Sequence, residues 1–570
     1  MKSPIRSASR LYAAAAAIVG LGPVFASAHS PTHPSLLPPL DSARLLSIPA
    51  PDLGAPGDET YAHLVDILRD LSPREREIIS RLYRDSPPNM GMDTELPPEL
   101  LTGSGGPEMA RLEAALDDAE VPAALADTPR AGPLLAGTAV MDVTPPQGCP
   151  LGGTGRWRDN LLVHDNELDP NWYAKFFWPP EGVNDPVLAK ALVLDNGDRK
   201  VVLVGLDAIG FSAHFFRLVT DRLTDLGIHR ENYFITATHN HAGPGDMNRL
   251  PFLWFGAMDV YDPRIALPFV EKLEALIRRA VADLEPARLG YNTGPDLIGL
   301  SKNSRGDVEK VDPTIGVLKI LRADGSAKAG LFNFAAHGDA LDREWPFISR
   351  DWSGFAEDAI EAELGEGTVF FHVNGAEGDQ VPDGHGRNHL EEARWVGESM
   401  ADQVVELWNQ TSTTDQVELD VAREIRWMGT PRSHPGIWTS EYPQIPWWIT
   451  VPLNRLVESV AKVSALRIND LLIHTVPGEP IHDIGVKIRA HALSRGFPQA
   501  WTFGLTNNYI AYITTWEEFW DGEYQAAATL FGPHTGLKMI RTSERVINEI
   551  ADRWSPSGPE GPTGADTPLH

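Results

Sequence analysis

The sequence predicts a mixed α/β (α+β) fold in which β-sheets are flanked by helices. From about residue 136 onward, short apolar runs alternate with amphipathic segments, and this alternation is typical of folds in which helices cover a sheet. Residues 201–206 and 233–238 predict two buried strands, and Ser212 between them predicts a helix N-cap. Further helices are expected at 263–284, 353–364 and 388–408, and further strands at 315–321, 329–335, 368–374, 417–427, 466–476 and 500–506.

Composition excludes several classes of protein. The 570 residues are 42% apolar and 8% aromatic, which excludes wholesale disorder, a collagen-like repeat and a coiled coil. The net charge of -29 has the wrong sign for holding a phosphate backbone, so we expect no nucleic-acid partner. The single Cys149 cannot form an internal disulfide, so the core must stabilise the chain.

The N-terminal 28 residues have the pattern of a signal peptide. A basic start is followed by an apolar stretch and by Ala26-Ser27-Ala28, which fits a cleavage site. We therefore expect an exported protein, either secreted or periplasmic. Residues 29–135 are Pro-rich with short helical patterns and predict an accessory segment. Residues 136–552 are expected to form a catalytic domain, and residues 553–570 a disordered tail.

Two histidines separated by one residue follow the predicted strand 233–238, in the run THNHAGPG. Side chains with this spacing at a strand end point to the same side, so His239 and His241 can bind one metal ion. Alternatively, one binds the metal and the other transfers a proton. A pair of hydrogen-bonded polar side chains at a sheet edge accounts for the pattern equally well.

Three further runs place polar groups at predicted strand ends. His337 closes an apolar strand in FAAHG, Glu479 lies in the turn VPGEP, and Tyr509 and Tyr512 lie in a run rich in aromatic residues. Taken singly, each of these residues is commonly structural. Together, two His, a Glu and an oxygen donor on separate strand ends would form a mononuclear zinc site with room for a water molecule.

The ordered set of motifs resembles the neutral/alkaline, non-lysosomal ceramidases. THNHAGPG is similar to the family's THTHSGPG, and the run YIAYITTWEEFWDGEYQAAATLFGPHT at 509–535 is the most family-specific feature. The resemblance covers about residues 136 to 550. Its remaining motifs are GTAVMDVTPP (137–146), FAAHG (334–338), NGAEGD (374–379) and PGE (477–479).

The resemblance implies one zinc ion per chain, held by two His, a Glu and a Tyr. Tyr509 competes with Tyr512 for the last of these positions. His241 would lie beside the zinc as the general base. The family's substrate-contacting arginine falls at Arg305 or Lys302, because the register of that segment is open. Matched by motif, the zinc ligands are His239, His337, Glu479 and Tyr512.

The resemblance also implies the reaction. We expect zinc-assisted hydrolysis of the N-acyl amide bond of ceramide, a lipid amide, to a fatty acid and a sphingoid base. The aromatic runs 252–255 and 447–448 either touch a membrane surface or pack in the core. Asp207 and Asp379 are candidates for orienting the histidines, or are ordinary turn residues.

Departures from the family pattern leave other functions open. Ala242 replaces the family's Ser, and we expect the family's C-terminal immunoglobulin-like domain to be absent. One alternative is a hydrolase of the same fold that acts on another N-acyl lipid or a small amide or ester. The other alternative is a non-catalytic lipid-binding protein, which predicts the loss of a metal ligand.

Overall fold

The computed structural model describes residues 128–153, 173–174, 177–248, 257–341, 345–428, 460–521 and 524–554. The expected signal peptide, most of the accessory segment, the aromatic runs 252–255 and 447–448 and nearly all of the expected tail lie outside these residues. Among the helices of the described part, none is long and apolar enough to cross a membrane.

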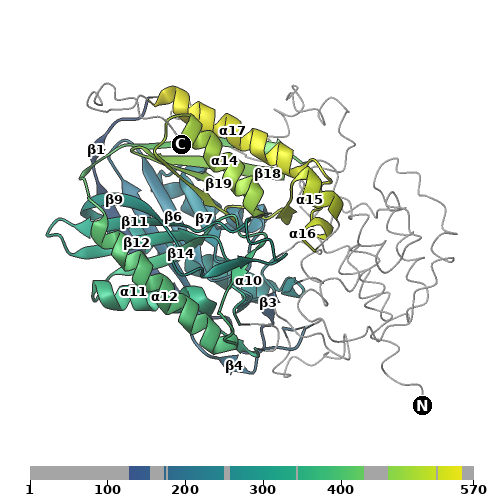
Figure 1. The fold of residues 1–570 in the computed structure, drawn as a ribbon. Coiled ribbons are helices and arrows are strands. Elements are labelled where there is room, and N and C mark those ends of the chain that lie inside the picture. Colours follow the sequence, from purple (N-terminus) through teal and green to yellow (C-terminus); the bar gives the residue numbers. More distant parts are fainter. Residues whose placement is uncertain are drawn as a thin grey trace, which may run out of the picture.

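An eight-stranded sheet forms the centre of the fold, in the order β14-β12-β11-β9-β2-β5-β6-β7 (Figure 1). The pairs β6–β7 and β12–β14 at its two edges are parallel, and the other neighbours are antiparallel. The strands are β2 (Leu135–Asp142), β5 (Leu188–Asp195), β6 (Lys200–Leu206), β7 (Tyr233–Ala237), β9 (Glu285–Pro295), β11 (Thr314–Arg322), β12 (Ala327–Phe334) and β14 (Val369–Asn374). Strands β6, β7 and β14 are almost continuously buried, because protein covers both faces of the sheet.

A four-stranded sheet packs on one face of the large sheet. Its order is β17 (Leu419–Trp427), β18 (Val460–Ile468), β19 (Leu471–Thr475) and β21 (Gln499–Phe503). Leu203 and Leu331 of the large sheet share a core cluster with Ile473 of the small one. The single strand expected at 466–476 is wrong, because the chain reverses at Asn469. This residue has φ 54°, a left-handed conformation that asparagine tolerates.

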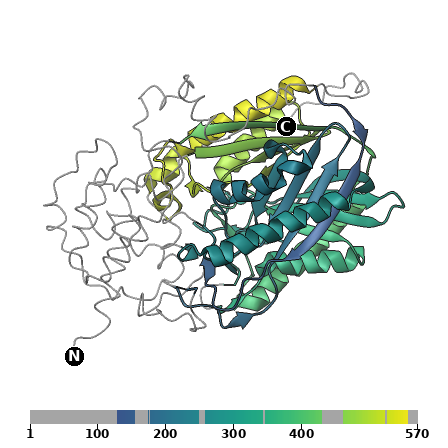
Figure 2. The same cartoon turned by 180° about the vertical axis from the view of Figure 1, so that it is seen from behind.

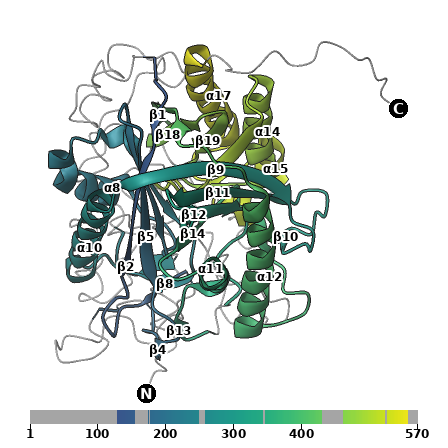
Figure 3. The same ribbon diagram turned by 90° about the vertical axis from the view of Figure 1, so that its left-hand side faces the viewer.

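Helices cover the outer faces of both sheets and confirm the mixed α/β class (Figures 1 and 2). The helix α10 packs beside β2 and β5 with α8 next to it, the helices α11 and α12 pack beside β9, β11 and β14, and the helices α14 and α17 cover the small sheet. Figure 3 shows α10 and α12 on opposite sides of the molecule. Their bounds are α8 (Ala213–Thr220), α10 (Pro263–Ala282), α11 (Asp351–Leu364), α12 (His389–Gln410), α14 (His482–Ser494) and α17 (Thr535–Arg553).

Short strand pairs and helices complete the described part. The pairs are β1 (Gly132–Pro133) with β16 (Gln416–Val417), β3 (Leu151–Gly153) with β8 (Ala242–Pro244), β4 (Gly182–Val183) with β13 (Phe347–Ile348), β10 (Ser301–Asn303) with β15 (Gln380–Pro382), and β20 (Glu479–Pro480) with β22 (Tyr512–Ile513). The helices are η2 (Asp221–Leu226), η3 (Arg230–Asn232), α15 (Trp516–Asp521) and α16 (Tyr524–Ala527).

The large sheet curls so that its two edges meet, because β14 at one edge touches β7 at the other. As a result, the segments that follow β7 and β12 run parallel, and Asn240 pairs with Gly338 in an isolated bridge.

Candidate metal centre

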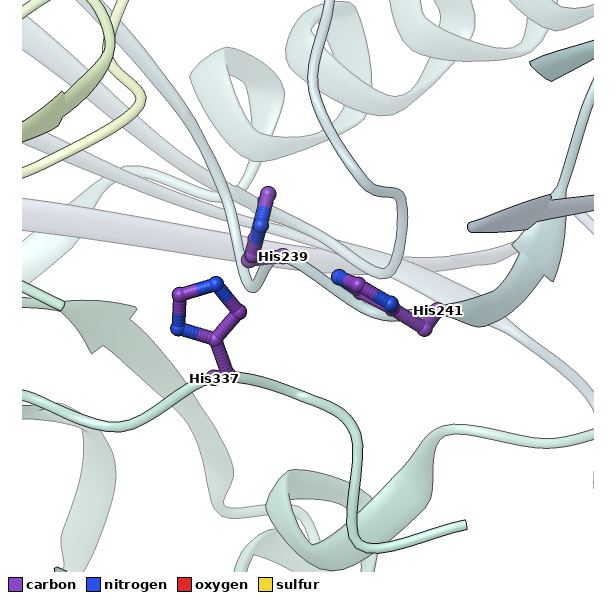
Figure 4. Close-up of side chains that lie close together, drawn as sticks. All are labelled: His239, His241 and His337. Carbon is purple, nitrogen blue, oxygen red and sulfur yellow. The ribbon is translucent and has the colours of Figure 1, made fainter. Parts of the chain in front are cut away.

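Three histidines meet where the chain leaves β7 and β12 (Figure 4). The ring centroid of His239 lies 4.9 Å from that of His241 and 4.6 Å from that of His337. One nitrogen of each ring lies within 4.8 Å of the other two. His239 adopts a left-handed φ of 59° after the end of β7. The two histidines of the HxH motif therefore come together through a turn, and not through the alternation of an extended strand as the sequence predicts.

Hydrogen bonds to carbonyl oxygens set which nitrogen of two of these rings is available. His239 Nδ1 lies 2.7 Å from the carbonyl oxygen of Ile209, and His337 Nδ1 lies 2.9 Å from that of Glu377 and 3.0 Å from that of Gln380. A carbonyl oxygen only accepts, so Nδ1 must carry the proton in both rings. In the neutral rings the lone pair is then on Nε2.

The Glu479 carboxylate lies next to the unprotonated Nε2 atoms of His239 and His337, so that three electron-pair donors face one another. Its Oε2 lies 3.2 Å from His239 Nε2 and 3.3 Å from His337 Nε2. Within the described part of the chain, Oε2 receives no hydrogen bond, and the side chain is buried. Three acceptors that face one another in a buried space repel unless a cation or a proton lies between them.

The spacing of these donor atoms fits a zinc ion. Ligands at about 2.0–2.1 Å in a tetrahedron lie about 3.3 Å from one another, and the two separations from Glu479 Oε2 are 3.2 and 3.3 Å. Two imidazoles and a carboxylate are also a donor set that zinc accepts. The residues present therefore fit the group that the resemblance implies.

The electrostatics of the cluster favour positive charge at its centre. Burial alone would lower the pKa of His337, but Glu479 and Asp339 outweigh it and raise that pKa to about 9. Burial would likewise raise the pKa of Glu479, but His239 and His337 hold it well below its ordinary range. In the absence of a metal ion, a proton on His337 takes the place of the cation.

The two candidate tyrosines contact different atoms. Strands β20 and β22 pair with Glu479 opposite Tyr512, and this register places the Tyr512 hydroxyl 3.1 Å from His337 Nε2. The hydroxyl of Tyr509 instead donates to Oε1 of Glu479, the oxygen away from the histidines. Burial and the nearby Glu479 raise the pKa of both tyrosines well above the ordinary value. Tyr512 is thus the one placed beside the convergence of donor atoms.

Tyr524 borders the site through Tyr512 and is not among the residues predicted from the sequence. It begins α16, and its ring meets that of Tyr512 edge to face with the centroids 5.4 Å apart. The signal was available, because Tyr524 lies within the matched run 509–535.

His241 lies beside the convergence of donor atoms and is only partly buried. The pKa of His241 falls well below its ordinary value, first because of burial and then because of its neighbour His239. Gly153 packs directly on this ring, and a Cβ at Gly153 would lie 2.9 Å from His241 Nδ1. His241 is therefore a neutral imidazole next to the cluster, which is the state that a general base requires.

The two cations expected to contact substrate have acidic partners. Lys302 is 54% exposed and pairs with Asp383 at 3.4 Å. Arg305 pairs with Glu518 at 3.6 Å and with Asp521 at 3.3 Å, both on α15. Their role toward a substrate stays a prediction.

The expected orienting aspartates hold the backbone around the site. The Asp379 carboxylate accepts from Asn303 Nδ2 at 2.9 Å and from the main-chain nitrogen of His482 at 2.8 Å. Asp207 accepts from the main-chain nitrogen of Leu188 at 2.9 Å. Glu377 of NGAEGD, which was not among the predicted site residues, orients His337 through its carbonyl oxygen.

Known proteins with similar sequences share one family. The family model described as "Neutral/alkaline non-lysosomal ceramidase, N-terminal" matches residues 167–417 and 449–541, more than half of the chain. The chain belongs to this family. A neutral ceramidase of Mycobacterium tuberculosis is 24% identical over 475 residues, which cover 67% of this chain and 74% of that protein. A neutral ceramidase of Pseudomonas aeruginosa is 23% identical over 458 residues, which cover 64% and 67%.

The fold agrees with this assignment. The crystal structure of neutral ceramidase from Pseudomonas aeruginosa superposes with a TM-score of 0.61 and 20% identity, covering 77% of this chain and 76% of that one. At this identity the superposition shows a shared fold. Within this shared fold, His239, His241 and His337 form a cluster that could hold a metal ion.

Proposed function

We propose that this protein is a zinc-dependent amidohydrolase that cleaves the N-acyl amide bond of ceramide to a fatty acid and a sphingoid base. The observation that carries the proposal is the convergence of His239 Nε2, His337 Nε2 and Glu479 Oε2 on one buried point. The family of the chain, and the relatives named neutral ceramidase, support ceramide as the substrate.

Four residues would hold one zinc ion per chain. His239, His337 and Glu479 supply the three converging donors, and Tyr512 supplies the oxygen nearest to them. When bound, a zinc ion lowers the pKa of a coordinated water and polarises the scissile carbonyl.

The chain's own groups would manage the protons. His241, held neutral by its surroundings, takes the proton of the attacking water on the ring nitrogen that faces the other two histidines. It then returns this proton to the leaving amine, so water is consumed and one acid and one amine are released. The carbonyl oxygens that hold Nδ1 of His239 and His337 keep both rings oriented during the reaction. Arg305 is the proposed cation on the substrate side.

We further propose export of the protein, secreted or periplasmic, because the first 28 residues have a signal-peptide pattern. A lipid amide resides in membranes, so we also propose contact with a membrane surface during catalysis. Fractionation of the expressing cells and co-sedimentation of the purified protein with ceramide-containing vesicles test these two points.

The central experiment measures zinc content and fatty acid release from a fluorescent N-acylsphingosine for the purified protein. His239→Ala is compared with His491→Ala, which removes a histidine bonded to Asn548 on the α14–α17 face. We expect about one zinc per chain in the wild type and the His491 variant, and loss of zinc and hydrolysis in the His239 variant. Zinc without ceramide cleavage would indicate another N-acyl lipid, amide or ester as substrate. Neither zinc nor hydrolysis would leave a non-catalytic lipid-binding protein.

A further inference from the structure

We propose that Asn240 is a positioning residue of the metal centre. It holds the turn that carries His239 and His241 against the segment carrying His337 and against the start of α11. The inference rests on the proposed function, because it concerns histidines of the proposed centre. Asn240 itself is 1% exposed and contributes no donor atom to the cluster of ring nitrogens.

The Asn240 side chain makes two hydrogen bonds, one within the histidine turn and one to a different segment. Its Oδ1 accepts from the main-chain nitrogen of Ala242 at 2.9 Å, which closes a side-chain turn around His241. Its Nδ2 donates to the carbonyl oxygen of Ser349 at 2.7 Å. The main-chain nitrogen of Asn240 also donates to the carbonyl oxygen of Ala208 at 3.1 Å. One residue thus shapes the turn and ties it to two other segments.

The anchor at Ser349 is itself fixed. The main-chain nitrogen of Ser349 donates back to the carbonyl oxygen of Ala242 at 3.1 Å, so the two segments bond in both directions. The Ser349 hydroxyl and the main-chain nitrogen of Arg350 both donate to the carboxylate of Asp185. The Nδ2 bond therefore joins the histidine turn to a rigid support in front of α11.

On its other side, Asn240 meets the segment that carries His337. It pairs with Gly338 in a parallel bridge, and the main-chain nitrogen of His241 donates to the Gly338 carbonyl oxygen at 2.8 Å. A Cβ at Gly338 would lie 2.9 Å from the Cα of Asn240, so the two backbones are in direct contact. Any displacement of Asn240 moves His239 and His241 relative to His337.

The chemistry of the two bonds predicts how substitutions differ. Asn240→Ala loses both bonds. Asn240→Asp keeps the acceptor for Ala242 but places a carboxylate oxygen against the Ser349 carbonyl. Asn240→Thr introduces the residue found here in the family motif THTHSGPG, and its hydroxyl is able to accept from Ala242. We therefore expect Thr to restore part of what Ala and Asp lose.

Asn196 offers a matched control. It is also buried, its Nδ2 donates to the carbonyl oxygens of Arg130 and Val417, and its Oδ1 accepts from the main-chain nitrogens of Asp198 and Arg199. It lies in the turn between β5 and β6, at the ends of these strands remote from the histidine turn. Asn196→Ala therefore removes at least as many hydrogen bonds without touching the proposed centre.

The test combines two measurements on the full chain. Hydrogen–deuterium exchange of the zinc-free protein reports on the peptides covering 236–248 and 345–352, and chelator competition reports the affinity for Zn²⁺. For Asn240→Ala and Asn240→Asp we expect faster exchange in both peptides and zinc affinity about 10- to 100-fold weaker, with partial recovery in Asn240→Thr. We expect Asn196→Ala to lower the melting temperature while changing zinc affinity less than about threefold.

Unchanged exchange at 236–248 in Asn240→Ala would overturn the inference, and so would an equal loss of zinc affinity in Asn196→Ala. If the wild type binds no zinc, the proposed function fails. The exchange comparison then still decides whether Asn240 holds the turn, because it needs no metal ion.

Discussion

Replacing Glu479 with glutamine tests whether its carboxylate creates the preference of this cluster for a positive charge. In the metal-free protein, burial lowers the pKa of His337, and Glu479 makes the largest contribution in the opposite direction. The pKa of His337 therefore rises from an ordinary 6.5 to about 9. At about 1.4 kcal/mol per pH unit, this difference corresponds to about 3 kcal/mol of stability. Because the folded-state pKa is the raised one, the stabilisation is complete below pH 6.5 and is lost as the pH rises through 9.

The assay is chemical unfolding of chelator-treated wild type and Glu479→Gln between pH 6 and pH 10. At pH 6, the free energy of unfolding of the wild type should exceed that of the variant. At pH 9.5, this difference should be smaller by about 3 kcal/mol. Added zinc should stabilise the wild type more at high pH than at low pH, opposite to the pH dependence without metal. Metal binding must displace the His337 proton, so the apparent zinc affinity of the wild type should rise by about tenfold per pH unit up to pH 9.

Glu424→Gln controls for the loss of a carboxylate, because Glu424 forms an exposed ion pair with Arg545. It should leave the zinc affinity and its pH dependence unchanged. If Glu479→Gln keeps both the wild-type pH dependence of unfolding and the wild-type zinc affinity, the carboxylate does not set the charge preference and the reasoning is refuted.

Four further substitutions separate the roles of neighbouring groups. His241→Gln should lower kcat by about 10²- to 10⁴-fold with zinc content retained, and loss of zinc in metal analysis would instead make His241 a ligand. Tyr512→Phe should weaken zinc binding in a chelator competition by about tenfold or more and by more than Tyr509→Phe, which removes only a hydrogen bond to the ligand Glu479, and equal losses would contradict the ligand choice. Burial and then Glu357 raise the pKa of Asp207 to about 8, so the native state keeps a proton that the unfolded chain releases above pH 4, and stability falls from pH 4 to pH 8. Asp207→Asn should remove this fall, by up to a few kcal/mol at pH 8, and an unchanged pH dependence of urea unfolding would count against it.

The sequence could predict the elements with strong periodicity and the residues at their ends. The helices expected at 263–284, 353–364 and 388–408 are confirmed as α10, α11 and α12, because their apolar stripes face a sheet. The strand end before His337 was equally visible, since β12 is an apolar run closed by a polar motif. Local pattern was enough wherever one face of an element is buried.

Contacts between distant segments were beyond local pattern. The choice between Tyr509 and Tyr512 depends on the register of β20 against β22, which pairs residues 33 positions apart. The geometry of His239 depends on a left-handed turn, and no glycine in the sequence marks it. The run 466–476 did carry a turn signal, Asn469-Asp470, but the apolar residues on both sides of it favoured a single strand.

The buried charges around the cluster suit a site that must stabilise negative charge in a transition state. Glu377 lies close to Glu479, and within the described part of the chain neither of its carboxyl oxygens has a hydrogen-bond partner. Burial, and then the charge of Glu479, raise the pKa of Glu377 well above its ordinary value, and both effects favour its neutral form. Two neutral imidazoles, a neutral Tyr512 and one carboxylate then give the donor set a single negative charge. A divalent cation held there would keep a net positive charge toward the oxyanion of amide hydrolysis, and an ionised Glu377 would cancel it.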